Sequence, residues 1–180
     1  MKKFIFSTAA LSLLFSACTE HYEQDQVVVL TEYQDLTASF DEQSRTYVED
    51  GKDLRWHADD RLTVFYGNTL NNQYKFNGDT GDNSGTFSVV PSSDLGTGNA
   101  LNSIYALYPY DTSATILESG EITYHLPAVQ SYDKDSFGRN ANSMVAVTNG
   151  PTDNFLAFRN LCGCLKIKLY GDITVSRIEL

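Results

Sequence analysis

The sequence predicts an all-β protein built as a sandwich or a barrel, and three observations support this prediction. Short runs of β-branched and aromatic residues recur at close spacing along the chain. Clusters of Gly, Asn, Asp and Ser separate these runs, as turns separate strands. No stretch of ten or more residues carries a convincing helical stripe. Short strands joined by polar turns are typical of sandwiches and barrels.

The predicted strands begin with two short β-prone segments, 27–30 (VVVL) and 36–40 (LTASF). Segment 61–67 (RLTVFYG) follows and ends at a Gly-Asn turn. Segment 103–110 (SIYALYPY) is apolar throughout, which predicts a strand covered on both faces. The remaining predicted strands are 73–78, 85–91, 121–130, 143–150 and 154–171.

The polar stretches 77–85 (NGDTGDNSG) and 92–100 are predicted turns. The first has enough oxygen ligands for calcium but lacks the EF-hand spacing. Gly, Asn and Asp are the usual turn residues, so a hairpin loop is the favoured interpretation of 77–85.

The last predicted hairpin turns at Gly171-Asp172. Its first strand places Leu165, Ile167 and Leu169 on one face, and its second resumes with Ile173 and Val175. A bulge is expected near Ser176-Arg177, because the apolar phase shifts there. The sequence ends at Leu180 inside an apolar run, from which we expect a fragment or a truncated gene product.

The first residues have the layout of a bacterial lipoprotein signal. Lys2 and Lys3 precede an apolar run too short to span a bilayer, and Ser16-Ala17 leads to a single cysteine, Cys18. This layout predicts cleavage between Ala17 and Cys18 and lipidation of Cys18. The alternative is an ordinary secretion signal in which the cysteine is incidental. The predicted organisation is a signal peptide at 1–17, an acidic tether and possible propeptide at 18–34, and one β-domain at 35–180.

The chain is acidic, with a net charge of −10. This charge argues against binding nucleic acid or anionic membranes through electrostatics. Besides Cys18, the cysteines are Cys162 and Cys164, which would share one face of a strand. The distance between their Cα atoms would then be near the upper limit for a disulfide. We expect two partly packed free thiols, although the sequence leaves their redox state open.

No recognised catalytic or metal-binding motif occurs, and no enzyme activity, cofactor or metal is expected. The three histidines, His21, His57 and His125, are far apart in sequence. A lone histidine such as the one in TYHLP is more often structural than catalytic. Asp59 and Asp60 lie close to Trp56 in sequence, as the paired carboxylates of a sugar-binding or glycosidase site would. Side chains at adjacent strand positions point to opposite faces, however, so these two cannot flank one glycosidic bond. A turn entering a strand, with Trp56 in the core, is the favoured interpretation.

An ordered set of motifs resembles the fimbrillin-like (Mfa-like) surface lipoproteins of Bacteroidales, over residues 36 to 180. The motifs YALYPY, LPAVQ and FRNLCGCLKIKL carry most of the resemblance. One departure is Asp59, where the family more often has Gly. The matching residues are Arg45, Thr46, Trp56, Asp60–Phe65, Phe87, Tyr105–Tyr110, Leu126, Pro127, Gln130, Met144–Ala146, Phe158–Gly163 and Leu165–Ile167.

The resemblance implies subunits or accessory proteins of surface fimbriae, built from transthyretin-like antiparallel β-sandwiches and anchored to the outer membrane by lipid. A second sandwich domain usually follows the first, so residues 35–180 would be an N-terminal domain that is incomplete at its C-terminal end. In the best-known members a trypsin-like protease cuts after an arginine, and a strand from another fimbrial subunit fills the groove that opens. Arg45, followed by Thr46, is the candidate cleavage residue. Alternatively, Arg45-Thr46 belongs to the first lasting strand and nothing is cut.

The expected role is therefore structural or adhesive, without catalysis. The alternative is a surface glycan-binding lipoprotein that does not polymerise, with Trp56, Tyr108 and Tyr110 as the candidate platform. Core packing explains these aromatic residues equally well. The sequence identifies no host or glycan ligand, and it leaves a stalk, tip or anchor role open.

Overall fold

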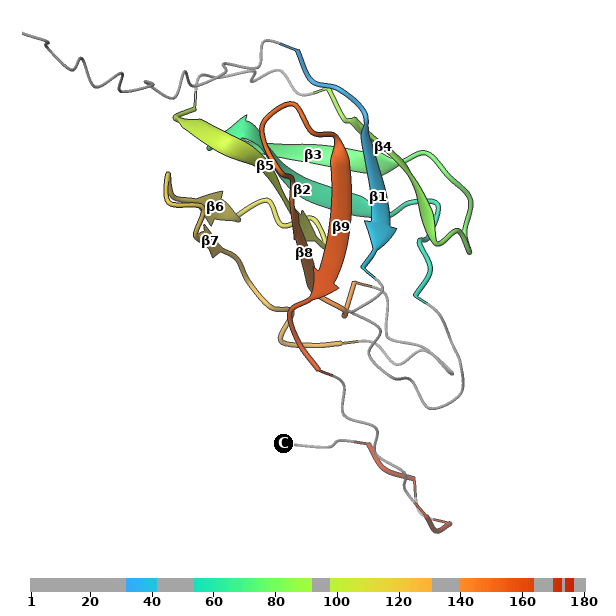
Figure 1. Cartoon of the computed structure of the whole chain (residues 1–180). Coiled ribbons are helices and arrows are strands. Elements are labelled where there is room, and N and C mark those ends of the chain that lie inside the picture. Colours follow the sequence, from blue (N-terminus) through green and yellow to red (C-terminus); the bar gives the residue numbers. More distant parts are fainter. Residues whose placement is uncertain are drawn as a thin grey trace, which may run out of the picture.

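The computed structural model describes residues 32–41, 54–91, 98–130, 140–163, 170–172 and 174–176. Every regular element within these ranges is a β-strand (Figure 1), which confirms the all-β prediction. None of these ranges contains a helix with the length and apolarity that a membrane crossing needs. The strands are β1 Leu36–Phe40, β2 Arg61–Asn68, β3 Asn71–Phe76, β4 Ser84–Val89, β5 Ala100–Tyr108, β6 Thr115–Ile116, β7 Ile122–Thr123, β8 Met144–Val147 and β9 Phe155–Asn160.

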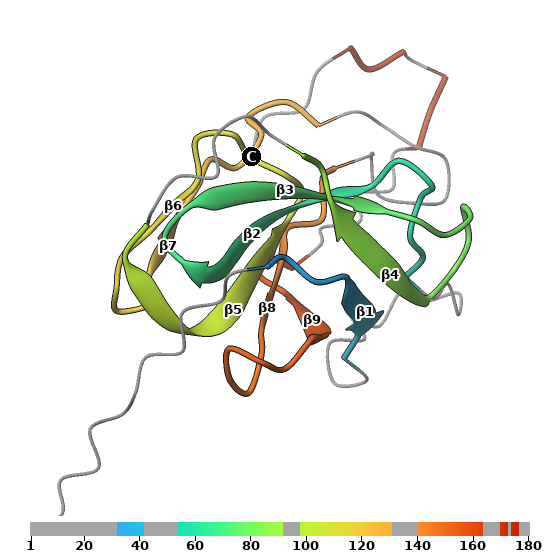
Figure 2. The same ribbon diagram turned by 90° about the horizontal axis from the view of Figure 1, so that it is seen from above.

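Seven of the described strands form one closed sheet in the order β1-β4-β3-β2-β5-β8-β9, and β6 pairs with β7 in a small separate sheet. Closure depends on β1, which pairs with β4 on one side and with β9 on the other (Figure 2). The β1–β9 pair is parallel, whereas the other pairs of the closed sheet are antiparallel. The sheet is thus barrel-like, with one parallel contact that the sequence did not predict.

Two apolar clusters lie on opposite faces of β2 and β5. Side chains that alternate along β2, namely Leu62, Val64 and Tyr66, point into the barrel, while Phe65 joins the outer cluster under β6 and β7. β5 is likewise covered on both faces, as its apolar sequence predicted. The inner cluster comprises Leu36, Ala38, Trp56, Leu62, Val64, Tyr66, Tyr74, Phe76, Phe87, Ile104, Ala106, Tyr108, Met144, Ala146, Leu156 and Phe158. The outer cluster comprises Phe65, Leu101, Leu107, Ala114 and Ile116.

Local turn chemistry explains two features of the sheet. The stretch 77–85 joins β3 to β4, which pair antiparallel, so the predicted hairpin is confirmed. The pairing of β2 with β5 shifts register between Tyr66 and Asn68, where Gly67 has a φ of +64°. Glycine adopts this left-handed conformation without steric cost, so the bulge falls at that residue.

Several predicted strands were too long, and the largest differences are in 121–130 and 154–171. Within 121–130 only Ile122–Thr123 is a strand, because the chain then leaves its partner and runs toward Asp111. The predicted strand 154–171 ends at Asn160. Residues 164–169 and 173, which hold most of the predicted last hairpin, lie outside the described residues, as does Arg177 of the predicted bulge. Val175 is exposed and is not in a strand, so its predicted place in the second strand of the last hairpin is wrong.

Candidate functional site

β1 is the strand that closes the barrel, and both of its edges are used. Its residues pair with β4 from Leu36 opposite Phe87 to Ser39 opposite Ser84. On the other edge they pair with β9 from Thr37 opposite Phe155 to Phe40 opposite Phe158. Beyond this ladder, Thr37 N donates to Asn154 O at 2.9 Å. A short strand of five residues is therefore held along its whole length.

The inward side chains of β1 belong to the barrel core. Leu36 and Ala38 are fully buried, whereas Thr37 between them is exposed. Phe40 is partly buried and stacks on Trp56, with ring centroids 4.6 Å apart and an interplanar angle of 23°. This alternation matches the period of a strand and explains why LTASF forms one here.

Two tyrosines hold the chain just before β1. Gln34 N donates to the Tyr66 hydroxyl at 3.2 Å, and the Tyr74 hydroxyl donates to Gln34 O at 3.3 Å. Burial raises the pKa of both phenols above that of a free tyrosine. Both phenols therefore stay neutral at ordinary pH and serve as hydrogen-bonding groups.

An ion pair holds the chain just after β1. Arg159 Nε on β9 donates to Asp41 Oδ2 at 2.7 Å, and Asp41 N donates to Phe158 O at 2.9 Å. The Arg159 side chain is 69% exposed, so water screens this pair and its net contribution is modest. β1 thus has a polar attachment at each end and an apolar middle.

Trp56 packs against the inward face of β1. Its ring meets Phe87, Phe158 and Tyr108 edge-to-face, with centroids 5.1, 5.5 and 5.7 Å away. Its backbone is fixed to the β3–β4 loop, because Trp56 N donates to Asp82 O and Gly81 N donates to Trp56 O. Removing β1 would uncover this aromatic cluster and leave unpaired backbone edges on β4 and β9. Such edges bind another extended segment readily.

The residues predicted from sequence to be cleaved or lipidated all lie outside the described ranges. Ala17 and Cys18 fall within 1–31, and Arg45 and Thr46 fall within 42–53. The segment 27–30 also lies outside, as does Cys164. Arg45 is four positions after Asp41, so a cut there would fall beyond β1.

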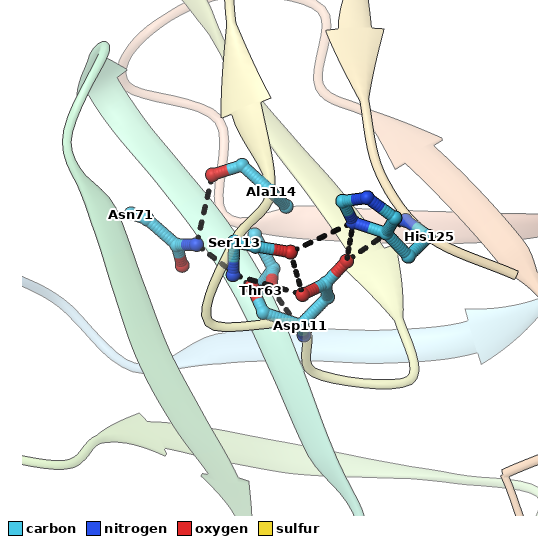
Figure 3. Close-up of polar contacts among 6 residues, drawn as sticks. All are labelled: Thr63, Asn71, Asp111, Ser113, Ala114 and His125. Atoms are coloured by element: carbon cyan, nitrogen blue, oxygen red, sulfur yellow. Dashed lines mark hydrogen bonds and ion pairs between the residues drawn. The ribbon is translucent and has the colours of Figure 1, made fainter. Parts of the chain in front are cut away.

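A second polar cluster joins Asp111, Ser113 and His125, which sequence reasoning did not bring together (Figure 3). Ser113 Oγ donates to Asp111 Oδ1 at 2.6 Å and lies 2.9 Å from His125 Nδ1. His125 N donates to Asp111 Oδ2 at 2.9 Å. The three residues are close because the β5–β6 loop and the segment after β7 lie side by side. The only sequence signal was the turn-forming run Asp111-Thr112-Ser113.

This cluster has the residue types of a nucleophilic triad but a different geometry. Ser113 Oγ and Asp111 Oδ2 approach the same ring nitrogen of His125, at 2.9 and 3.7 Å. In a proton relay the serine and the carboxylate occupy opposite ring nitrogens. Partial burial alone would raise the pKa of Asp111, but the hydrogen bonds from Ser113 and His125 outweigh it and lower that pKa. The arrangement suits a structural carboxylate.

The same loop is fastened to the barrel wall. Asp111 O accepts from Thr63 Oγ1 at 3.2 Å and from Asn71 Nδ2 at 2.8 Å, and Asp111 N donates to Thr63 Oγ1 at 3.0 Å (Figure 3). Asn71 Nδ2 also donates to Ala114 O. The network therefore attaches the β6–β7 region to β2 and β3.

The candidate glycan platform is not assembled on the surface. Trp56 and Tyr108 are 1% and 8% exposed and belong to the inner core, as the core-packing interpretation predicted. Tyr110 alone of the three lines a shallow pocket of about 340 Å³. The pocket is lined by Asp59, Arg61, Pro109, Tyr110 and Asn140.

Asp59 and Asp60 lie on opposite sides of the chain, as expected. Asp59 is exposed and forms an ion pair with Lys75 at 3.8 Å. Asp60 is buried, where its carboxylate accepts hydrogen bonds from His57 N and from the Tyr108 hydroxyl. The two carboxylates therefore do not flank one bond of a substrate. Instead, Asp60 fixes the turn that leads into β2.

The described cysteine, Cys162, is free and exposed, so the prediction that it is partly packed is wrong. The strand ends at Asn160, and Cys162 lies in the bend that follows. In the part of the chain that the structure describes, no group of three or more His, Cys, Asp or Glu side chains is placed to hold a metal ion.

Comparison with known proteins finds no matching family model, no significantly similar curated protein and no significantly similar solved structure.

Proposed function

We propose that this chain is a lipid-anchored surface subunit, or an accessory protein, of a fimbria, with a structural or adhesive role and no catalysis. It assembles by β-strand addition with other fimbrial subunits, on the outer membrane and at the cell surface. The proposal rests on the resemblance of the sequence to fimbrillin-like lipoproteins and on one structural observation. Among the described strands, β1 is the one that pairs with both β4 and β9, and it precedes Arg45.

That observation supports a maturation mechanism. A cut after Arg45 would separate β1 covalently from β2 and the strands that follow it. Hydrogen bonds, packing and the Asp41–Arg159 ion pair would then hold it without a covalent link to β2. An equivalent strand from a neighbouring subunit could replace it and form the same backbone hydrogen bonds.

The same observation is compatible with a transthyretin-like β-sandwich as the underlying fold. Without β1, the sheet would be open, with free edges at β4 and β9. Its two halves would face each other across Trp56, which contacts Phe87 on β4 and Tyr108 on β5. Two sheet halves packed around a shared apolar core make a layered sandwich.

The glycan-binding alternative receives no comparable support, because two of its three candidate aromatics are buried. The shallow pocket beside Tyr110 does not supply the flat aromatic platform that this alternative requires.

Intact mass and N-terminal sequencing of the protein recovered from cell envelopes test the proposal. A lipid-modified start at Cys18 is expected for an anchored or accessory subunit, and a start at Thr46 for a polymerising subunit. An unmodified start at any other position would contradict both forms of the proposal.

A further inference from the structure

The place that β1 occupies between β4 and β9 is called the β1 slot. We infer that the β1 slot selects an incoming strand by side-chain size, and that it accepts a large aliphatic, a small and an aromatic residue at alternate positions. The strand must also run parallel to β9. This inference rests on the proposed strand addition and adds the chemistry of the partner: an extended peptide with the pattern of Leu36, Ala38 and Phe40. Three inward positions and one direction carry the argument.

The first position accepts a large aliphatic side chain. Leu36 is fully buried opposite Phe87 on β4, within the inner cluster. The neighbouring Gln34 backbone is fixed by Tyr66 and Tyr74, so the strand enters the slot at a defined register. A small residue here would leave a cavity in a closely packed core, and a charged residue would be buried without a partner.

The second position accepts only a small side chain. Ala38 is fully buried between Gly85 on β4 and Leu156 on β9. The Phe76 ring covers Gly85 so closely that a Cβ placed on that glycine would lie 2.6 Å from the ring. Because Ala38 and Gly85 are paired residues, a larger side chain at position 38 would extend toward the Phe76 ring, and overpacking there is destabilising.

The third position accepts an aromatic ring. Phe40 stacks on Trp56, while Phe158 lies opposite on β9 and meets Trp56 edge-to-face. An aliphatic residue would lose the stacked contact, and alanine would uncover the indole face. The outward position Thr37 is exposed, so the slot places no comparable demand on size there.

The direction follows from the two edges. The slot offers β4 for antiparallel pairing and β9 for parallel pairing, and these edges present different spacings of donors and acceptors. A strand inserted in reverse would mismatch both edges. It would also place its ends away from the tyrosines that hold Gln34 and away from Arg159, which pairs with Asp41.

The test uses the full chain with the recognition sequence of a highly specific protease inserted after Ser44. After cleavage, a dye-labelled peptide of residues 32–41 is added and its binding is followed by fluorescence anisotropy. Peptides carrying Ala38→Leu or Phe40→Ala, and a peptide of reversed sequence, are compared with it. A Thr37→Leu peptide is the matched control, because it adds bulk at the outward position.

The native peptide and the Thr37→Leu peptide should bind within about threefold of each other. The Ala38→Leu and Phe40→Ala peptides should bind at least about tenfold more weakly, and the reversed peptide should not bind. Equal binding of all peptides would overturn the size selection and leave strand addition standing. Failure of the native peptide to enter the cleaved chain would instead contradict the proposed strand addition.

A measurement on the uncut chain keeps the inference testable if the cleaved chain aggregates. Ala38→Leu should lower the thermal midpoint of the intact protein, whereas Thr37→Leu should leave it nearly unchanged. Equal midpoints for the two variants would show that position 38 does not select a small side chain.

Discussion

At the scale of single residues, the contact between Phe40 and Trp56 links β1 to the core of the barrel. Trp56 is the single tryptophan of the chain, and its ring is covered by β1 on one side and by the barrel wall on the others. Phe40 therefore acts as a cover over the aromatic cluster. Its removal should affect both stability and the environment of the indole.

Phe40→Ala should lower the free energy of unfolding by about 2–3 kcal/mol, because a partly buried aromatic ring and its stacked contact are lost. Urea unfolding followed by circular dichroism measures this change. Phe155→Ala on β9 is the control, since that ring is 47% exposed, and it should cost less than about 1 kcal/mol. Equal losses for the two variants would mean that Phe40 is not part of the core.

Asp111 should make stability depend on pH in the acid range. Its folded pKa lies below the ordinary value of 3.8, so the carboxylate contributes stability that is present above that value. This contribution is lost as the pH falls through the lower, folded pKa. The thermal midpoint of the native protein should therefore exceed that of Asp111→Asn at pH 6, and the difference should shrink as the pH falls below 3.8.

Ser113→Ala should reduce the same pH-dependent difference, because it removes the hydroxyl that donates to Asp111 Oδ1. A difference between native protein and Asp111→Asn that is constant from pH 6 to pH 2.5 would contradict this account of the cluster.

At the scale of elements, β1 and β4 fit together because one contributes Ala38 and the other Gly85 at paired positions. The Phe76 ring lies against Gly85 and fills the space that a side chain there would need. The packing of β1, β3 and β4 thus depends on the absence of a side chain at Gly85.

Gly85→Ala should therefore lower the free energy of unfolding by about 1–3 kcal/mol through overpacking against Phe76. Chemical denaturation measures the loss. Adding Phe76→Leu should make the two losses less than additive, because the smaller side chain relieves the clash. Strictly additive losses would show that Phe76 and position 85 do not compete for space.

The strands that sequence predicted well are those with a clear local pattern. LTASF forms β1 with the predicted bounds, and 61–67 and 103–110 match β2 and β5 closely. The run 121–130 was overestimated, because its β-prone residues do not find a long partner strand. β6 was missed, since two residues carry no measurable period.

The candidate site was only partly predictable, because it depends on contacts between residues that are distant in sequence. A β-prone segment ahead of Arg45 was visible in the sequence, but its parallel pairing with β9 joins residues 118 positions apart, as Asp41 and Arg159 show. The meeting of Asp111, Ser113 and His125 depends on how two loops cross. No local pattern records contacts of either kind.

At the scale of the whole molecule, closure of the sheet would link the proposed cut to the proposed assembly. While β1 occupies its place, the closed sheet offers no free edge at β4 or β9. Release of β1 would create two such edges at once. Assembly should therefore depend on the cut and not on concentration alone.

Treatment with an arginine-specific protease should convert the native protein from monomers into larger species, while Arg45→Gln should remain monomeric. Analytical ultracentrifugation measures the size, and intact mass verifies that the cut is at Arg45. Identical behaviour of the two proteins after a verified cut in the native chain alone would contradict the link between cleavage and assembly.

The parallel contact between β1 and β9 also sets an order in time. β1 is among the first strands to leave the ribosome, yet its second partner is the last described strand of the barrel. Contacts so distant in sequence form slowly, because a long loop must close before any pairing energy is gained. The first described strand to be synthesised therefore completes its pairing only after the last described strand of the barrel has been made. Until β9 is made, β1 has only β4 as a partner, so during synthesis its other edge stays unpaired, and the nascent chain is most prone to mispairing at that edge.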